Sequence, residues 1–138
     1  MATPLPQSDP HAASAATLYD ALGGEPAVRA LVDRFYDRMA TAPEFRALRD
    51  LHAVDLGPMR AKLADWLSGW LGGPPRYFDR PDAVCIGAAH RPYAIDASLR
   101  DAWLECMAGA LQDAAVPARL VAQLRPAFAA LAEALRNR

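Results

Sequence analysis

Residues 67–96 read LSGWLGGPPRYFDRPDAVCIGAAHRPYAID, and this stretch decides the fold. It begins inside an apolar helical pattern that stops at the Gly-Gly-Pro-Pro run of residues 72–75, because glycine and proline in succession terminate a helix. From Arg76 to Pro92 there is no clear periodicity, and loops of that length inside compact domains are uncommon and usually functional or disordered. Helical periodicity resumes after Asp96, a residue type that caps helix N-termini.

The sequence on both sides of this stretch has the period of amphipathic helices. Short helical segments are expected over 17–22 and 43–49, and the helix before the loop is expected to start near Asp55. Pro126 lies inside the last helix and should kink or split it. No strand pattern competes, so the sequence predicts an all-α fold with four substantial helices. Their inward faces are expected within 28–39, 56–70, 99–111 and 120–135.

The composition is that of one ordinary globular domain. The chain has 138 residues, of which 53% are hydrophobic and 22% are charged, so it can fold without a disulfide or metal. Its 15 basic residues are matched by 16 acidic ones, which argues against broad electrostatic binding of nucleic acid. No segment is apolar for long enough to span a membrane.

The N-terminal segment and the cysteines indicate where such a chain resides. Residues 1–16 are rich in Pro, Ser and Ala, lack the features of a secretory signal, and are predicted to form a flexible tail before a domain over 17–138. Cys85 and Cys106 lack metal-type spacing, which is typical of a reduced, cytoplasmic chain. Both are interpreted as packing residues, with a redox role for Cys85 as the alternative.

His90 is the first candidate for chemistry. Small residues flank it in the segment 88–95, so a bulky group can approach its imidazole. Neutral imidazole is a common metal ligand and is the proximal ligand of haem iron in globins. The local sequence by itself favours a histidine that only makes a hydrogen bond in a loop.

Four further residues stand out in helical or loop positions. Tyr36 places a hydroxyl and Trp103 an indole N–H on otherwise apolar helix faces, although plain core positions explain both. His52 follows a short helix and is either a functional residue or an exposed loop histidine. Lys62 lies beside Arg60 on the helix before the loop, where the pair could bind an anion or form a solvated face.

Taken together, these segments resemble the truncated haemoglobins, specifically the group II (O-type) branch. The resemblance runs from about Thr17 to about Leu135, with five segments in the family's order. The branch usually has basic residues just before the proximal histidine, whereas this chain has Cys-Ile-Gly-Ala-Ala at 85–89. The five segments are 18–24, 34–36, 67–74, 90–95 and 100–107.

The resemblance implies a two-over-two helical sandwich around haem b, with His90 as the proximal iron ligand. It places Tyr36 and Trp103 as distal hydrogen-bond donors to bound O2. His52 matches the distal position after the short third helix, although a gap near 40–44 would make Leu51 the match instead.

The remaining haem contacts implied by the resemblance lie on the helix before the loop and around His90. Lys62 matches a basic position that can pair with a haem propionate, and Arg91 or Tyr77 would compensate for the missing basic residues. The other contacts expected at the haem are Met59, Leu63, Trp66 and Tyr93.

The function implied by the resemblance is reversible binding of O2, NO or CO at a pentacoordinate haem iron. Several distal donors would slow O2 release, which favours sensing, scavenging or redox chemistry over bulk transport. Two alternatives remain open: a haem redox enzyme with NO dioxygenase or peroxidase activity and an unidentified reductase, and a haem-free helical interaction module. The apolar fraction permits either a monomer or a homodimer.

Overall fold

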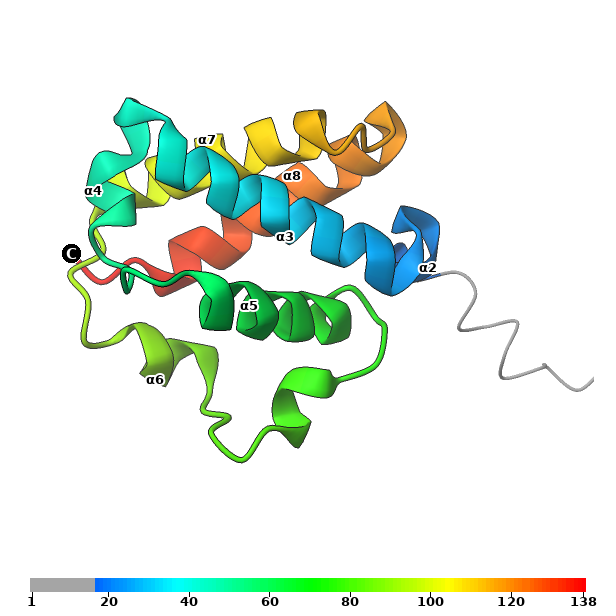
Figure 1. Cartoon of the computed structure of the whole chain (residues 1–138), viewed down its shortest axis with the longest axis horizontal. Coiled ribbons are helices and arrows are strands. Elements are labelled where there is room, and N and C mark those ends of the chain that lie inside the picture. Colours follow the sequence, from blue (N-terminus) through cyan, green and yellow to red (C-terminus); the bar gives the residue numbers. More distant parts are fainter. Residues whose placement is uncertain (1–16) are drawn as a thin grey trace, which may run out of the picture.

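The computed structural model describes residues 17–138, and within them all regular structure is helical (Figure 1). The predicted N-terminal tail lies outside the described residues. The four substantial helices are α3, α5, α7 and α8, as the periodicity predicts. The elements are α2 (Leu18–Leu22), α3 (Gly24–Thr41), η1 (Pro43–Phe45), α4 (Arg46–Arg49), α5 (Gly57–Trp70), η2 (Arg76–Asp79), α6 (Ile86–His90), α7 (Ala97–Asp113) and α8 (Ala118–Leu135).

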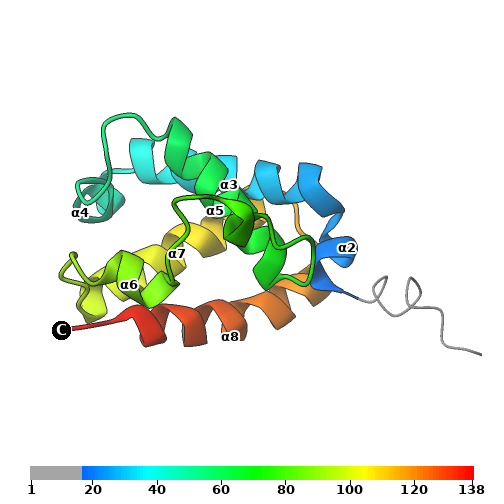
Figure 2. The ribbon, with the colours of Figure 1, turned by 90° about the horizontal axis from the view of Figure 1, so that it is seen from below.

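The long helices form two layers. Figure 2 shows α3 and α5 on one side of the molecule and α7 and α8 on the other. α3 packs against both α5 and α7, and α7 packs against α8. This is the predicted all-α sandwich of two helices over two, and it leaves room between the layers for a cavity. No helix within residues 17–138 is long and apolar enough to cross a membrane.

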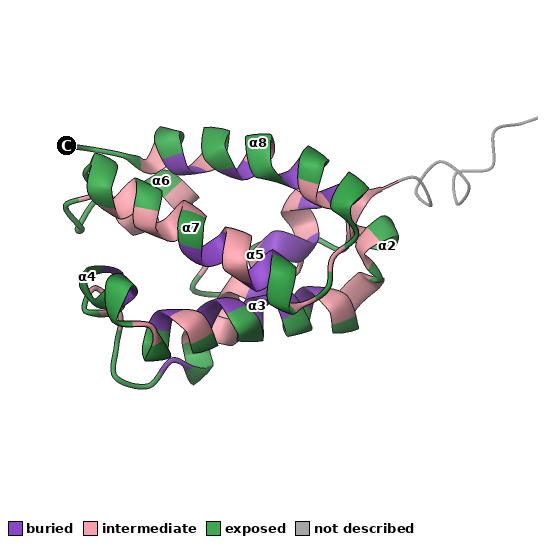
Figure 3. Ribbon diagram, turned by 90° about the horizontal axis from the view of Figure 1, so that it is seen from above, coloured by how far each residue is buried: buried purple, intermediate pink, exposed green. Residues whose placement is uncertain are grey.

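The core lies where the inward faces meet, and Figure 3 shows buried segments on the facing sides of the long helices. Leu67 of α5 and Cys106 of α7 are fully buried, which confirms Cys106 as a core residue. Aromatic rings cross the layers: Phe128 of α8 stacks on Trp70 of α5, with ring centroids 4.9 Å apart. Burial of these apolar side chains contributes most of the favourable free energy that stabilises the sandwich.

The helix boundaries are set by local chemistry. The Asp96 carboxylate accepts a hydrogen bond from the backbone N–H of Leu99 at 2.9 Å and so caps α7, as predicted. At α5 the cap position is Leu56 and not Asp55, but the Asp55 carboxylate still accepts from the N–H of Gly57 at 2.9 Å. α8 runs unbroken through Pro126, so a split was wrong. Pro126 lies on the exposed face, where water can solvate the carbonyl it deprives of a partner.

The segment 76–92 is more regular than the sequence predicts, because it contains η2 and α6. Both helices are too short to show a periodic pattern, so sequence periodicity misses them. A side-chain hydrogen bond within the segment and an ion pair to α5 help to hold it instead. The Tyr77 hydroxyl donates to the Val84 carbonyl at 2.8 Å, and the Arg80 guanidinium pairs with the Asp65 carboxylate of α5 at 2.9 Å.

Candidate functional site

A cavity of about 470 Å³ lies between the two layers of helices. Its volume falls in the range of roughly 300–1,000 Å³ that small-molecule and cofactor sites occupy. Every residue that the sequence predicts at the haem lines this cavity, with the exception of Arg91. The residues brought together are Tyr36, His52, Met59, Lys62, Leu63, Trp66, Tyr77, His90, Tyr93 and Trp103.

His90 is the last residue of the short helix α6, and it is partly buried at the cavity wall. Its Nδ1 lies 2.7 Å from the carbonyl oxygen of Ile86. A carbonyl can only accept a hydrogen bond, so Nδ1 carries the proton and Nε2 keeps its lone pair. Nε2 makes no hydrogen bond within residues 17–138. This is the arrangement in which a histidine binds a metal through Nε2, its other nitrogen fixing the ring orientation.

His52 is held in the same way on the other side of the cavity. Its Nδ1 lies 2.9 Å from the carbonyl oxygen of Leu48, so neutral His52 presents Nε2 as an acceptor. Burial lowers the pKa of His52 below its ordinary value, and Arg49 and His90 add smaller repulsions. Leu51 lines the cavity as well, so the structure brings both candidates for this position to the site.

Tyr36 and Trp103 bring two polar groups into the cavity from α3 and α7. Neither the Tyr36 hydroxyl nor the Trp103 indole N–H has a hydrogen-bond partner within residues 17–138. The Tyr36 ring is 2% exposed, and burial raises the pKa of its phenol well above its usual value, so it stays a proton donor. Phe35 packs against both side chains, with ring centroids 5.1 Å from Tyr36 and 5.4 Å from Trp103. These contacts fix two unpaired donors in a mostly apolar space.

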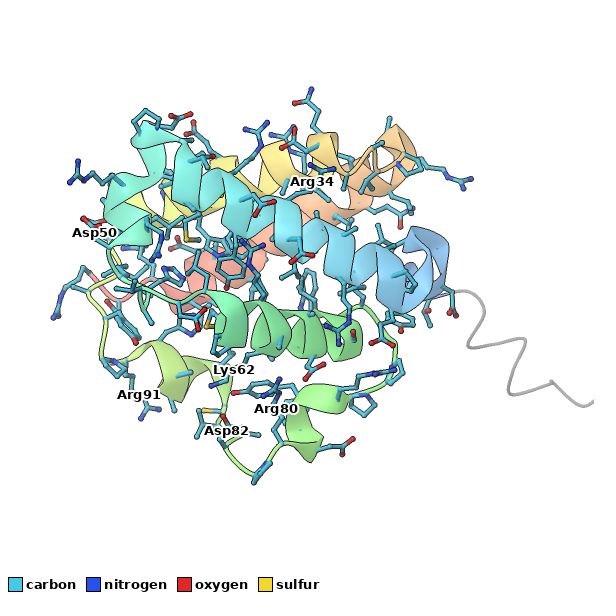
Figure 4. The ribbon with its side chains drawn as sticks, viewed as in Figure 1. Arg34, Asp50, Lys62, Arg80, Asp82 and Arg91 are labelled. Carbon is cyan, nitrogen blue, oxygen red and sulfur yellow. The ribbon has the colours of Figure 1, made fainter. Side chains whose placement is uncertain are left out.

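The α5 side of the cavity is apolar except at its edge. Met59, Leu63 and Trp66 supply the apolar surface. Lys62 lies at the edge, where its ammonium nitrogen is 3.2 Å from the Asp82 carboxylate. Figure 4 shows the two side chains meeting below α5. The hydrogen bond from the Lys62 ammonium, helped by its charge, keeps the pKa of the exposed Asp82 carboxyl below its usual range.

Two predicted residues lie elsewhere. Arg91 follows α6, is exposed, and does not line the cavity; Figure 4 shows it directed away from the fold. Cys85 is also exposed, so its interpretation as a packing residue was wrong. It is the N-cap residue of α6, and its Sγ accepts from the N–H of Ala88 at 3.4 Å.

Sequence reasoning missed several further lining residues on α6, α7 and the segment between them, and all of those on α8. Inward helical periodicity identifies the α8 positions only as core, because periodicity does not separate core from cavity lining. The main additional lining residues are Ile86, Ala89, Ile95, Leu99, Arg100, Leu131, Ala132 and Leu135.

The residues present fit a haem. The cavity is large and mainly apolar, which suits the macrocycle. A single imidazole presents an unpaired Nε2, which suits the iron. No group of three or more His, Cys, Asp or Glu side chains within residues 17–138 could hold a metal ion without such a cofactor. A lysine at the cavity edge suits an anionic substituent.

Comparison with known proteins agrees with this geometry. The model of the bacterial-like globin family matches residues 17–137. The group 2 truncated hemoglobin YjbI of Bacillus subtilis is 37% identical over 93 residues, which is 67% of each chain.

Solved structures give the same result. The group II 2-on-2 hemoglobin of Agrobacterium tumefaciens superposes with a TM-score of 0.83 at 34% identity and covers 96% of this chain and 98% of its own. The cold-adapted truncated hemoglobin of Pseudoalteromonas haloplanktis superposes with a TM-score of 0.84 at 36% identity, covering 88% and 98%. The chain therefore belongs to the bacterial-like globin family of haem-binding proteins, in its group II truncated haemoglobin branch.

Proposed function

We propose that this globin holds haem b through Nε2 of His90, reversibly binds O2, NO or CO, and releases O2 slowly. The observation that carries the proposal is the pairing of one free imidazole nitrogen with two unpaired donors in the same cavity. Haem, when bound, would supply an iron that His90 coordinates and that also binds a diatomic gas.

The role of His90 is to present a basic nitrogen in a fixed orientation. Its Nδ1–H donates to the Ile86 carbonyl at 2.7 Å, which fixes the tautomer and restricts rotation of the ring. Such a hydrogen bond also raises the basicity of the coordinating nitrogen. The small residues Gly87 and Ala89 of α6 leave the approach to the imidazole open.

The role of Tyr36 and Trp103 is to donate hydrogen bonds to a ligand that gains negative charge. Because neither donor has a protein partner within residues 17–138, neither must give up a hydrogen bond to reach the ligand. Neutral His52 presents a lone pair at Nε2 instead, so it can accept a hydrogen bond but not donate one to the ligand from that atom. In a dry pocket each donated bond stabilises the bound ligand by about 1 kcal/mol.

Two such bonds would slow the release of O2 by about tenfold or more. A 30% identical relative whose structure is known is described as a truncated oxygen-avid haemoglobin, from Bacillus subtilis. Lys62 supports retention of the cofactor, because its ammonium can exchange the Asp82 carboxylate for a haem propionate at the same edge.

The test is an absorption spectrum of the purified protein with added hemin, ferric and dithionite-reduced, with and without O2 and CO. We expect a Soret band that shifts with each gas, and a His90→Ala variant that no longer retains haem. Protein that stays colourless with hemin would instead support the haem-free interaction module. An unaltered Soret band in His90→Ala would remove His90 as the ligand.

A further inference from the structure

The segment between α6 and α7 is held by residues that are more than 40 positions away in the sequence. The side-chain amide nitrogen of Asn137 donates to the Tyr93 carbonyl at 2.8 Å, and its amide oxygen accepts from the N–H of Ile95 at 2.8 Å. The backbone N–H groups of Asn137 and Arg138 donate to the Ile95 carbonyl at 2.9 and 3.1 Å. Four hydrogen bonds therefore join 93–95 to 137–138.

This segment connects directly to His90. The N–H of Tyr93 donates to the carbonyl of His90 at 3.1 Å, which closes a turn at the end of α6. Tyr93 and Ile95 also line the cavity. The position of 93–95 consequently affects both the cavity wall and the residue that carries the free imidazole nitrogen.

An ion pair joins the last turn of α8, which precedes Asn137, to α7. The Glu133 carboxylate of α8 binds Arg136 at 2.8 Å and Arg100 of α7 at 2.6 Å. These two guanidinium groups hold the pKa of Glu133 at about 2, so the carboxylate is ionised throughout the neutral range.

α6 packs against α8 but is otherwise weakly held. It has five residues, none of them buried, and its N-cap is a weak thiol acceptor with a 3.4 Å contact. A helix this short is not stable by itself, so its orientation depends on the segments at its ends. The amide of Asn137 is suited to hold segment 93–95 in place, because one side chain both donates to the Tyr93 carbonyl and accepts from the Ile95 N–H.

We infer that Asn137 is a positioning residue for His90: it fixes segment 93–95, and through the turn at Tyr93 it sets the orientation of the imidazole and slows haem loss. The inference rests on the proposed role of His90 as the iron ligand. It names a residue outside the cavity as part of the support for that ligand.

The experiment compares haem-loaded wild type with Asn137→Ala, Asn137→Asp and the control Gln123→Ala. Gln123 is exposed on α8 and makes no side-chain hydrogen bond within residues 17–138. Two properties are measured: the rate of hemin transfer to an excess of a haem-scavenging protein, and the iron–histidine stretching band of the ferrous, ligand-free protein by resonance Raman.

We expect Asn137→Ala, which removes both side-chain hydrogen bonds, to lose hemin at least about fivefold faster and to shift or broaden the iron–histidine band. Fivefold is about the factor that corresponds to one net hydrogen bond. Asn137→Asp keeps the acceptor but replaces the donor with a carboxylate facing the Tyr93 carbonyl, so it should behave like Asn137→Ala. If Asn137→Ala does not fold, Asn137→Asp provides the test. Gln123→Ala should match wild type.

Wild-type loss rates and an unchanged band in both Asn137 variants would overturn the inference while leaving the haem site intact. Faster hemin loss with an unchanged band would also overturn it, since Asn137 would then support the fold without orienting His90. A wild-type protein that takes up no hemin contradicts the proposed function itself, which separates the two failures.

Discussion

His52 and His90 line the same cavity, and each holds its Nδ1 against the carbonyl oxygen four residues before it, at 2.9 and 2.7 Å. In both neutral rings Nε2 therefore carries no proton and has a free lone pair. Their surroundings differ: His52 lies beside the phenol of Tyr36, whereas His90 ends a short helix flanked by small residues. The same hydrogen bond to the backbone thus leaves Nε2 free on both histidines, on His90 for the proposed iron and on His52 for accepting a hydrogen bond.

The unpaired donors of Tyr36 and Trp103 are expected to control the rate of O2 release. Tyr36→Phe and Trp103→Phe each remove one donor and keep the aromatic ring in the cavity. We expect each variant to release O2 about fivefold faster, because one net hydrogen bond is worth about 1 kcal/mol. Stopped-flow measurement of O2 dissociation from the ferrous protein checks this.

Two aromatic residues outside the cavity provide matched controls. Tyr19→Phe and Trp70→Phe make the same chemical changes at positions that do not line it. Both should leave the O2 dissociation rate unchanged. Equal rates in wild type, Tyr36→Phe and Trp103→Phe would refute the role of these donors.

The buried His52 predicts a pH dependence of stability. Its pKa is lower in the folded protein than the ordinary 6.5, so the unfolded chain takes up the proton first as the pH falls. Protonation of the unfolded state lowers the free energy of unfolding, and the loss begins as the pH falls through about 6.5. Denaturant unfolding at several pH values should show this slope in wild type, and it should be reduced in His52→Gln. Parallel curves for the two proteins between pH 7 and pH 5 would show that His52 does not contribute.

Two glycines predict opposite effects of the same substitution. A Cβ at Gly73 would lie 2.5 Å from the Tyr19 ring, whereas a Cβ at Gly87 in α6 would meet nothing within 4 Å. We expect Gly73→Ala to lower the free energy of unfolding by about 1–3 kcal/mol through this clash. Gly87→Ala should raise it by about 0.5–1 kcal/mol, because alanine stiffens the helix that carries His90. Urea unfolding measures both, and a stabilising Gly73→Ala would show that Tyr19 can move aside.

Because Leu111 is packed between the helices, we expect its truncation to lower the free energy of unfolding strongly. This α7 side chain is 1% exposed and lies in the core outside the cavity. Leu111→Ala should lower the free energy of unfolding by about 2–5 kcal/mol, since it removes apolar contacts and leaves a void. Val54 is 95% exposed, and Val54→Ala should change the free energy of unfolding by less than about 0.5 kcal/mol. Similar midpoints of urea unfolding for the two variants would contradict the assignment of Leu111 to the core.

Helical periodicity and end signals are local properties, and the sequence expresses them directly. The Gly-Gly-Pro-Pro run at 72–75 ends α5, and Asp96 caps α7, as the residue types predict. Periodicity also places Cys106 in the core. It fails at α6, because five residues make little more than one helical turn, and at Cys85, which is exposed although its residue type favours burial.

By itself the sequence determined four long amphipathic helices, the break between α5 and α7, and the histidine that stands near the end of that break. Only the tertiary structure decided which side chains share a cavity. It brings Tyr36, Trp103 and His90 together, leaves Arg91 outside, and joins Asn137 to Tyr93. The reason is physical: helix formation depends on neighbours within about four residues, whereas a cavity and its support depend on how separate helices pack against one another.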